Sequence, residues 1–458
     1  MAAAMVAVSA VYGGEIDSSL QVVLDRTDSD EHISVLVFMN HQADIDQLTS
    51  QMYEDRLGRH ERHVAVVTSL QHAAAHGQQN VLAWLDSQSP KKVSEVQPFW
   101  ISSSIAIDAT PEIIEALADR NDVALVAFDH PIELVAPEVS DDTDHQRAAA
   151  GGPEQGLIAI GAPDVWAMGY TGEGIVVSNM DTGVHGSHEA LADRWRGLNP
   201  LYNGHPEWAF YDPYTNNNAF PFDAGSHGTH TMGSVCGGLP GAQIGVAPGA
   251  EWIAAAPIDR AGISQTVSDA ILSFQWFADP DGNPATSFDV PHTNSNSWGL
   301  VTSHGYPECD TTFWSFIDNC EAAGVIVLFS AGNEGSSGLR RPGDRALDDF
   351  RNMAVAATDP YSGNSIASFS SRGPTYCTSD GTVAIKPDIA APGVSTYSSV
   401  PGGYSSYNGT SMASPHVNGV MALMLQANPD LTSEQVKQII YDTATDLGAP
   451  GKDNDYGY

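Results

Sequence analysis

The feature that most constrains the fold is a series of short apolar runs after residue 156, with helix-forming stretches between several of them. We expect strands at residues 175–180, 252–257, 290–295, 325–330, 353–357 and 385–390. Runs without polar alternation predict strands that are buried on both faces, and intervening helices predict parallel crossover connections. The sequence therefore predicts an α/β fold, with a mostly parallel sheet covered by helices on both faces. Active sites in such sheets gather at the carboxyl ends of the strands.

Residues 31–135 predict a separate, smaller domain. The expected order is a strand at 33–39, helical stretches that end near Leu85, strands at 93–98 and 100–107, a helix opened by Thr110-Pro111-Glu112, and a strand at 123–129. This βαββαβ order predicts a ferredoxin-like α+β sandwich. A helix-borne zinc site is one interpretation of the histidines in this domain, but we favour solvated side chains for His60, His63, His72 and His76.

Two further segments are not predicted to form domains. Residues 136–155 are acidic and rich in glycine and small residues, which predicts an exposed linker with a processing site. Residues 1–30 begin with a small, apolar stretch that lacks the basic start of a secretory signal, so we interpret them as a truncated signal and N-terminal lead. The larger domain then occupies residues 156–458.

The charge of the chain narrows the class of protein. The 458 residues carry a formal net charge of −37, which would repel nucleic acid and anionic membranes. We attribute this acidity to a generally solvated surface rather than to adaptation to salt. No stretch approaches the ~20 uninterrupted apolar residues of a transmembrane helix. The acidity therefore suits a protein kept soluble in salty or extracellular surroundings.

The four cysteines allow up to two disulfides in an oxidising compartment. A bond between Cys309 and Cys320 is disfavoured, because a helix at residues 311–322 would hold the two ~16 Å apart. The other pairings stay open among Cys236, Cys309, Cys320 and Cys377.

A serine between a tight turn and a long helix-forming run is the first sign of catalysis. Ser411 follows Gly409 and Thr410, and the run 412–427 predicts a helix with Pro415 near its start, where a missing N–H costs least. Unpaired N–H groups at a helix N-terminus favour a developing anion. An ordinary helix cap would look the same, so residues elsewhere must decide.

Two upstream segments supply the partners that a serine nucleophile needs. An apolar strand runs into Asp181, and His227 stands at the head of a predicted helix at 228–236. A neutral imidazole must take the hydroxyl proton, and a carboxylate must fix the imidazole tautomer. The order aspartate, histidine, serine differs from that of α/β-hydrolases. A zinc site at His227 and His230 is disfavoured, because the glutamate of HExxH is missing.

Seven sequence motifs resemble those of a known family. They are NMDTGV (179–184), HGTHTMGSV (227–235), IGVAPGA (244–250), SAGNEG (330–335), FSSRGP (369–374), IKPDIAAPG (385–393) and NGTSMASPHV (408–417). On these strings the chain resembles the subtilisin-like serine peptidases, or subtilases, of the bacillopeptidase F type. The strings span most of residues 156–458, so the resemblance implies a subtilisin-like peptidase domain there.

The resemblance implies a catalytic role for each matching residue. Asp181 would orient the base, His227 would be the general base, and Ser411 would be the nucleophile. Asn333 would donate a hydrogen bond to the oxyanion beside the Ser411 N–H.

The same resemblance implies substrate-binding residues. Ser297, Trp298 and Gly299 would pair with the substrate backbone as an added strand. Trp298 would either line an apolar subsite or pack in the core. Gly332 and Glu334 would lie at the pocket for the residue before the scissile bond, and Glu334 would favour a basic side chain there.

The resemblance also predicts how the protein is made and used. We expect a secreted serine endopeptidase that acts on proteins or peptides through an acyl-enzyme. Residues 31–135 would be an inhibitor-type propeptide that the enzyme removes itself by cutting within 136–155. The alternatives are a catalytically silent binding protein of this family and a serine esterase.

No cofactor is expected to be required. The segment after the predicted His227 helix lacks the asparagine-rich loop by which many subtilisins hold calcium, which leaves a structural calcium ion elsewhere as an open alternative. The family usually continues through a closing strand or helix beyond the position of Tyr458, which leaves a C-terminally truncated fragment as an open alternative.

Overall fold

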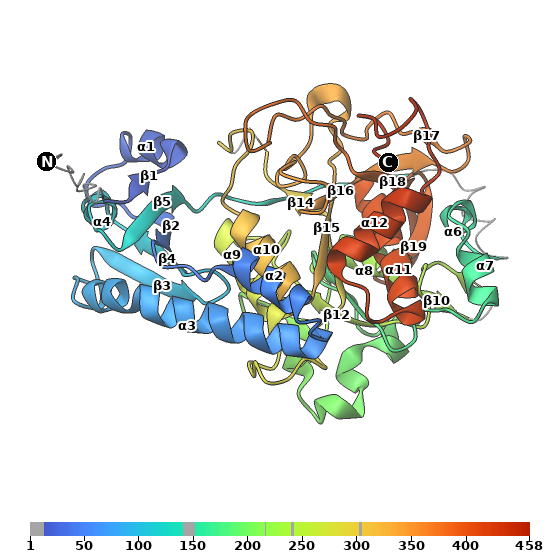
Figure 1. The fold of residues 1–458 in the computed structure, drawn as a ribbon, viewed down its shortest axis with the longest axis horizontal. Helices are drawn as coiled ribbons and strands as arrows, with labels where there is room; N and C mark the ends of the chain where they lie inside the picture. Colours follow the sequence, from blue (N-terminus) through green and yellow to red (C-terminus); the bar gives the residue numbers. More distant parts are fainter. Residues whose placement is uncertain (1–12, 141–151, 216, 240–241, 302–304) are drawn as a thin grey trace, which may run out of the picture. The chain divides into compact units, whose positions relative to one another are not determined.

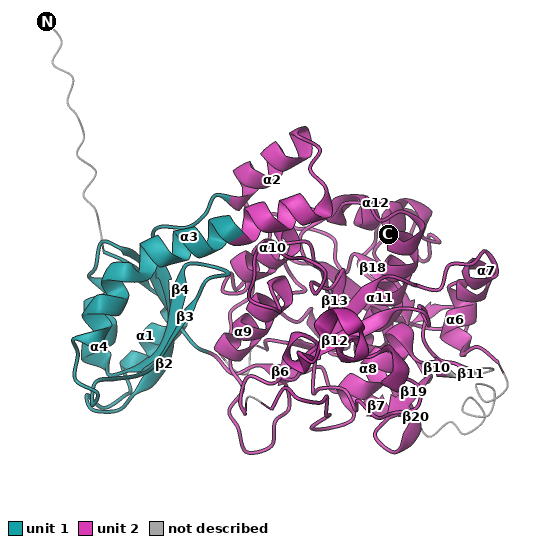
Figure 2. Ribbon diagram, turned by 90° about the horizontal axis from the view of Figure 1, so that it is seen from below, with its two compact units in different colours: residues 1–44, 68–129 teal, residues 45–67, 130–458 magenta. Residues whose placement is uncertain are grey.

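The described residues form two compact units. The structure is a computed structural model that describes residues 13–140, 152–215, 217–239, 242–301 and 305–458. One unit comprises residues 1–44 and 68–129, and the other comprises 45–67 and 130–458 (Figures 1 and 2). The start of the predicted signal and most of the predicted linker lie outside the described residues. The predicted domain boundaries stay predictions, and the larger unit includes residues 45–67 and 130–135 as well.

The smaller unit contains a sheet with the strand order β1-β5-β2-β4-β3. All neighbours in it are antiparallel except β1 and β5. Its elements are β1 (Glu15–Ile16), α1 (Ser18–Leu24), β2 (Ile33–Met39), β3 (Val93–Phe99), β4 (Ser104–Ala109), α4 (Pro111–Ala118), β5 (Val123–Phe128) and, from residue 68, α3 (Arg59–Asp86). From β2 onward this is the predicted βαββαβ order.

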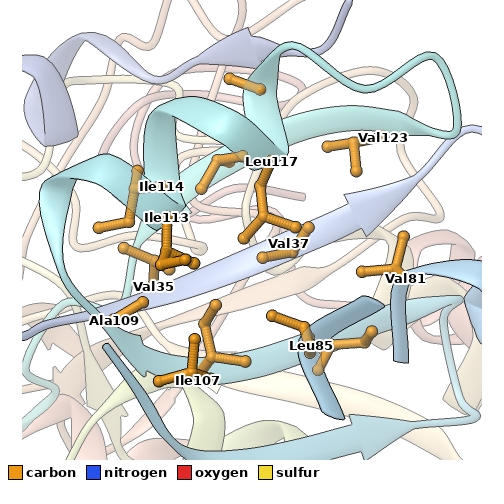
Figure 3. Packing of buried hydrophobic residues seen from close by; sticks show 14 of the residues in the cluster. Val35, Val37, Val81, Leu85, Ile107, Ala109, Ile113, Ile114, Leu117 and Val123 are labelled. Carbon is orange, nitrogen blue, oxygen red and sulfur yellow. The ribbon is translucent and has the colours of Figure 1, made fainter. Parts of the chain in front are cut away.

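One face of this sheet makes the core of the smaller unit. Apolar residues at alternate positions of β2 point to the same face, as the pleat requires. Val35 and Val37 from β2 pack with Leu85 from α3 and with Ile114 and Leu117 from α4 (Figure 3). β4 begins later than predicted, because residues 100–103 form the turn that joins it to β3.

The larger unit is built on an eight-stranded sheet with the order β17-β16-β15-β13-β8-β12-β9, in which β18 also pairs with β16. Every pair in it is parallel except β16 with β17. The strands are β8 (Val176–Met180), β9 (Phe210–Tyr211), β12 (Glu251–Ala255), β13 (Thr293–Asn296), β15 (Ile326–Ser330), β16 (Met353–Asp359), β17 (Ser365–Ile366) and β18 (Ile389–Pro392). The prediction of a mostly parallel sheet is confirmed.

Two strands of this sheet begin later than the sequence predicts. β13 starts at Thr293 rather than at residue 290, and β18 starts at Ile389 rather than at residue 385. Pro291 and Pro387 lie in the residues that were predicted to be strand but precede β13 and β18. A proline has no N–H to donate to a ladder, so each ladder forms only after the proline.

Helices cover both faces of the sheet, with α9 and α10 on one side and α8 and α11 on the other (Figure 1). α11 packs on β13, β15 and β16 as well as on α8. The helices are α2 (Ile45–Glu54), α6 (Gln155–Ala159), α7 (Ala162–Ala167), α8 (His227–Cys236), α9 (Val267–Ala278), α10 (Trp314–Ala322), α11 (Thr410–Ala427) and α12 (Ser433–Thr443). None of the helices in the described residues combines the length and apolar character that a bilayer crossing needs.

Small sheets complete the larger unit. β6 (Glu133–Leu134) pairs with β14 (Trp298–Gly299), and β7 (Glu138–Val139) pairs with β20 (Gly403–Asn408), which itself pairs with β19 (Thr396–Val400). β10 (Gly238–Leu239) pairs with β11 (Ala242–Gln243). Short 3-10 turns lie at 192–194, 196–198, 200–202, 206–208 and 335–337.

A disulfide joins Cys309 to Cys377, with 4.9 Å between their Cα atoms. Cys236 and Cys320 are buried free thiols. The expectation against a Cys309–Cys320 bond is confirmed, because Cys309 pairs with Cys377 and Cys320 is free.

Candidate active site

Asp181 directly follows β8 and is held by a network of buried donors. Its carboxylate oxygens lie 2.8 and 3.0 Å from Nδ1 of His227, the first residue of α8. The Thr182 N–H donates to Oδ1 at 2.7 Å, and the Thr231 hydroxyl donates to Oδ2 at 3.2 Å. A carboxylate only accepts, so Nδ1 of His227 carries the proton and Nε2 is the basic nitrogen.

Close packing between the end of β8 and the start of α8 sets this pair. A Cβ on Gly228 would come 2.0 Å from the carbonyl oxygen of Gly183, so only glycine fits after His227. Asp223 accepts hydrogen bonds from the Thr182 hydroxyl and the Thr229 N–H, and burial raises the pKa of its carboxyl. No string or spacing in the sequence marks Asp223 as a functional residue.

Ser411 is the second residue of α11 and is fully buried. Its hydroxyl donates to the carbonyl oxygen of Val135 at 2.8 Å. Nε2 of His227 is buried and has no hydrogen-bond partner among the described residues. The structure thus joins Asp181 to His227, and it directs Ser411 at a peptide carbonyl rather than at the imidazole.

Pro415 lies inside α11 rather than near its start, which corrects the sequence interpretation. Its missing N–H would have bonded to the carbonyl oxygen of residue i−4, which is Ser411. The Ser297 hydroxyl donates to that oxygen at 3.4 Å instead. A side chain of the predicted substrate segment therefore supports the backbone of the predicted nucleophile.

Asn333 is fixed in a donating orientation. Its Oδ1 accepts from both the N–H and the hydroxyl of Thr410, each at 2.9 Å. Its Nδ2 donates to the carbonyl oxygen of Ala136 at 3.0 Å. Gly332 has φ of +112° and donates its N–H to the Thr410 hydroxyl at 3.2 Å. The turn at 332–333 is thereby locked to the N-terminus of α11.

Residues 130–136 lie as an added strand beside these groups. β6 is antiparallel to β14, with Glu133 opposite Gly299 and Leu134 opposite Trp298. The Val135 N–H donates to the Ser297 carbonyl at 3.0 Å. A substrate strand is predicted to pair with 297–299, but nothing in the sequence marks residues 130–136 as that strand.

The same segment is paired on its other edge and further along. The Ile132 N–H donates to the Gln265 carbonyl at 3.0 Å, and Pro131 forms an isolated β-bridge with Thr266. After Ala136, β7 pairs with β20, and the Ser140 N–H donates to the Ser406 carbonyl at 2.8 Å. Backbone pairing therefore holds the segment on both sides of the Ser411 hydroxyl.

Trp298 is a core residue. Its side chain is 1% exposed and packs against the rings of Phe274, Phe313 and Phe329. Its indole N–H donates to Oδ1 of Asn296 at 3.1 Å. Of the two alternatives for this side chain, the structure shows core packing, and only the backbone of Trp298 meets the added strand.

The carboxylate of Glu334 is already paired within the chain, and its predicted preference for a basic residue stays a prediction. Oε1 lies 2.8 Å from the Arg340 guanidinium, and Oε2 accepts from the Ser371 hydroxyl at 3.0 Å. An ion pair of this kind leaves little net charge for a ligand.

Among the described residues, no histidine of the larger unit belongs to a cluster of potential metal ligands. His230 donates from Nε2 to the carbonyls of Thr396 and Ser405, and burial lowers its pKa to about 3. His63 is 1% exposed and faces the Ala323 carbonyl at 3.1 Å, so the expectation of a solvated side chain is wrong for it.

A cluster of acidic ligand atoms lies elsewhere in the larger unit. Oxygens of Asp279, Asp281 and Asp289 lie within 4.8 Å of one another. The Asp281 N–H donates to Asp289, and the Asn283 N–H and the Thr286 hydroxyl donate to Asp281. The loop thus bonds to its own carboxylates, and we assign no ion to it.

Comparisons with known proteins agree with this geometry. A family model described as the subtilase family matches residues 172–458. The chain belongs to the subtilase family. Bacillopeptidase F of Bacillus subtilis (strain 168) is 34% identical over 418 residues, which cover 87% of this chain and 28% of that protein. Subtilisin E of the same strain is 34% identical over 297 residues, which cover 64% of this chain and 66% of that protein.

A solved structure supports the fold of this subtilase. The crystal structure of fervidolysin from Fervidobacterium pennivorans, described as a keratinolytic enzyme related to subtilisin, matches with a TM-score of 0.64 and 23% identity. The match covers 98% of this chain and 61% of that one. Measured against the two curated relatives above, the subtilase spans 28% of the length of bacillopeptidase F and 66% of that of subtilisin E.

Proposed function

We propose that this subtilase is a serine endopeptidase that acts through Asp181, His227 and Ser411 and cuts its own chain. The observation that carries the proposal is the contact of 2.8 Å between the Ser411 hydroxyl and the Val135 carbonyl oxygen, within a segment bound as an extended strand. Main-chain pairing of an extended segment is the recognition mode of a protein substrate. The curated subtilisins among its relatives support the same class of reaction.

The chemistry follows from the atoms already placed. Oγ of Ser411 attacks the carbonyl carbon of Val135, and its proton passes to Nε2 of His227, whose cation the Asp181 carboxylate stabilises. The amide N–H of Asn333, which donates to the Ala136 carbonyl in the structure, would change partner to the Val135 oxygen. Together with the N–H of Ser411 it would stabilise the negative charge on that oxygen. The C–N bond breaks, the proton passes from His227 to the departing amine, and water then hydrolyses the acyl-enzyme.

We assign the first cut to the bond between Val135 and Ala136. The Ser411 hydroxyl contacts the carbonyl of Val135, whose side chain is fully buried, whereas Ala136 is exposed. Attack one residue later would have to expel the ring nitrogen of Pro137, within a tertiary amide. The proposal places the cut at the bond just before the linker at 136–155, whereas the sequence predicts a cut within the linker.

Residues up to 135 would therefore act as a propeptide and intramolecular inhibitor, because their last residues fill the groove that a substrate needs. We also propose that the protein is secreted, which the Cys309–Cys377 disulfide supports, since disulfides persist in oxidising compartments. The proposed reaction uses groups of the chain and water, so no organic cofactor is part of the proposal. Its substrates would be proteins or peptides.

Mass spectrometry of the purified chain tests the proposal. Wild-type protein should yield a fragment that ends at Val135 and a product that begins at Ala136, while Ser411→Ala should stay intact. A fluorophosphonate probe should label the processed protein at Ser411, and His227→Ala should abolish the labelling. Efficient cutting in purified Ser411→Ala would refute self-processing.

The silent binding protein and the esterase make different predictions. A silent protein would neither cut itself nor react with the probe. An esterase would hydrolyse small activated esters but leave extended peptides intact, although the pairing between β6 and β14 favours extended substrates.

A further inference from the structure

The side chain of Arg340 lies along the added strand. Its Nη1 donates to the Leu134 carbonyl at 3.0 Å, and its side chain is 11% exposed. A Cβ on Gly299 would come 3.1 Å from Cβ of Arg340, so the glycine lets the arginine approach the strand closely. The Arg340 N–H donates to the Ala331 carbonyl at 3.0 Å, which fixes the arginine backbone beside the turn that holds Asn333.

The Arg340 guanidinium meets two carboxylates. Glu334 accepts from it at 2.8 Å on the enzyme side. Glu133, two residues before Val135, lies 3.8 Å from Nη2, and its side chain is 44% exposed. The planar guanidinium has enough donors to serve the strand carbonyl and both carboxylates at once.

We propose that Arg340 is a specificity-determining residue that favours a carboxylate on the third residue before the scissile bond. The inference rests on the proposed function, in which Val135 is the first residue before that bond and Glu133 the third. The guanidinium also neutralises Glu334, so the groove gives no advantage to a basic residue next to the cut.

Peptide kinetics test the preference. Three peptides that carry Glu, Gln or Lys before the common sequence Leu-Val-Ala should be compared with processed wild-type enzyme. We expect kcat/KM to be about 2- to 5-fold higher for Glu than for Gln, the size typical of a partly exposed ion pair, and lowest for Lys. High salt should reduce the difference, because it screens exposed charges. Equal values for Glu and Gln would overturn the proposal.

Variants separate this contact from general effects of charge. Arg340→Gln should cut the Gln peptide but lose the preference for Glu, and Arg340→Glu should favour Lys. Arg351→Gln is the matched control, because it removes a positive charge from an arginine that pairs instead with Asp46 and Asp318. It should keep the preference. A preference that survives in Arg340→Gln would also overturn the proposal.

A second measurement does not depend on catalysis. In full-length Ser411→Ala the strand stays uncut, and the exchange of the Val135 amide reports how firmly it is docked. Glu133→Lys should speed this exchange by about 2- to 5-fold, and adding Arg340→Glu should slow it again. A chain that never cuts would refute the proposed function, while this rescue would still support the role of Arg340. Absence of the rescue would contradict it.

Discussion

The Asp181–His227 pair and the groove that holds residues 130–136 are built in different ways. The pair lies at the junction of β8 and α8, both partners are buried, and its supporting donors come from the neighbouring residues Thr182 and Thr231. The groove is assembled from segments far apart in the chain, around 265, 297–299 and 333–340. On the proposed function, the contacts that orient the base would come from residues adjacent to Asp181 and His227, whereas substrate choice would depend on how distant loops meet.

The strongest test of this contrast is Asp181→Asn, the change expected to have the largest effect. An amide would present the wrong hydrogen-bonding group to Nδ1 of His227 and favour the unreactive tautomer, so kcat should fall by about 10⁴-fold with little change in KM. Peptide hydrolysis measures both constants after the propeptide of wild type and variant has been cut with an added protease, because Asp181→Asn is not expected to process itself. Asp193→Asn is the matched control, because Asp193 is exposed. A fall in kcat of less than tenfold at Asp181 would break the contrast.

Asn333→Ala should have the next largest effect. Asn333 belongs to both regions, since Oδ1 is held by Thr410 at the start of α11 and Nδ2 reaches the bound strand. Removing one oxyanion donor should lower kcat by about 100- to 1,000-fold while KM changes little, because the bond strengthens in the transition state.

Asn333→Asp sharpens this second test. It keeps the shape of the side chain and an acceptor for Thr410 but has no donor for the substrate oxygen, so it should be as damaged as Asn333→Ala. A large rise in KM with kcat intact would instead assign Asn333 to ground-state binding.

The same contrast explains what could be predicted from the sequence. Asp181, His227 and Ser411 stand at strand ends and helix starts, where apolar runs, glycines and helix patterns mark them. The starts of β13 and β18 were predicted too early, because the apolar runs contain prolines that end the pairing. The position of Pro415 was predicted wrongly, because the sequence does not give the exact start of α11. These errors are local and small.

The groove could not be predicted in the same way. Glu334 was expected to attract a basic residue, because the sequence does not show that Arg340 folds back onto it. The residues next to Trp298 in the sequence do not show whether its side chain faces a substrate or the core. Its packing against the rings of Phe274, Phe313 and Phe329 shows that it faces the core. Contacts between distant loops leave no periodic pattern in the sequence.

The smallest of these effects concerns stability rather than catalysis. His230 lies in α8 one turn after His227, stacks on the ring of Tyr407 at 4.3 Å, and gives its Nε2 proton to two backbone carbonyls. Burial, with smaller effects from His227 and His416, lowers its pKa from 6.5 to about 3. Between those pH values the unfolded chain binds a proton at this position and the folded chain does not. The stability that His230 contributes is therefore complete above about pH 6.5 and falls as the pH drops toward 3, by up to ~1.4 kcal/mol per pH unit.

His230→Gln isolates this contribution, because an amide can still donate to the two carbonyls but does not titrate. Other buried groups titrate as well: the pKa of Asp279 is raised to about 7 and that of Asp289 to about 6, mainly by burial, which opposes the effect of His230 over the same range. The quantity to measure is thus the difference in melting temperature between the parent and His230→Gln, both in the Ser411→Ala background to prevent self-digestion. The parent should be the more stable protein at pH 7.5, and its advantage should shrink steadily between pH 6.5 and pH 4. A difference that stays constant over this range would show that folding does not lower the pKa of His230. It would contradict the interpretation that His230 is buried as a neutral side chain.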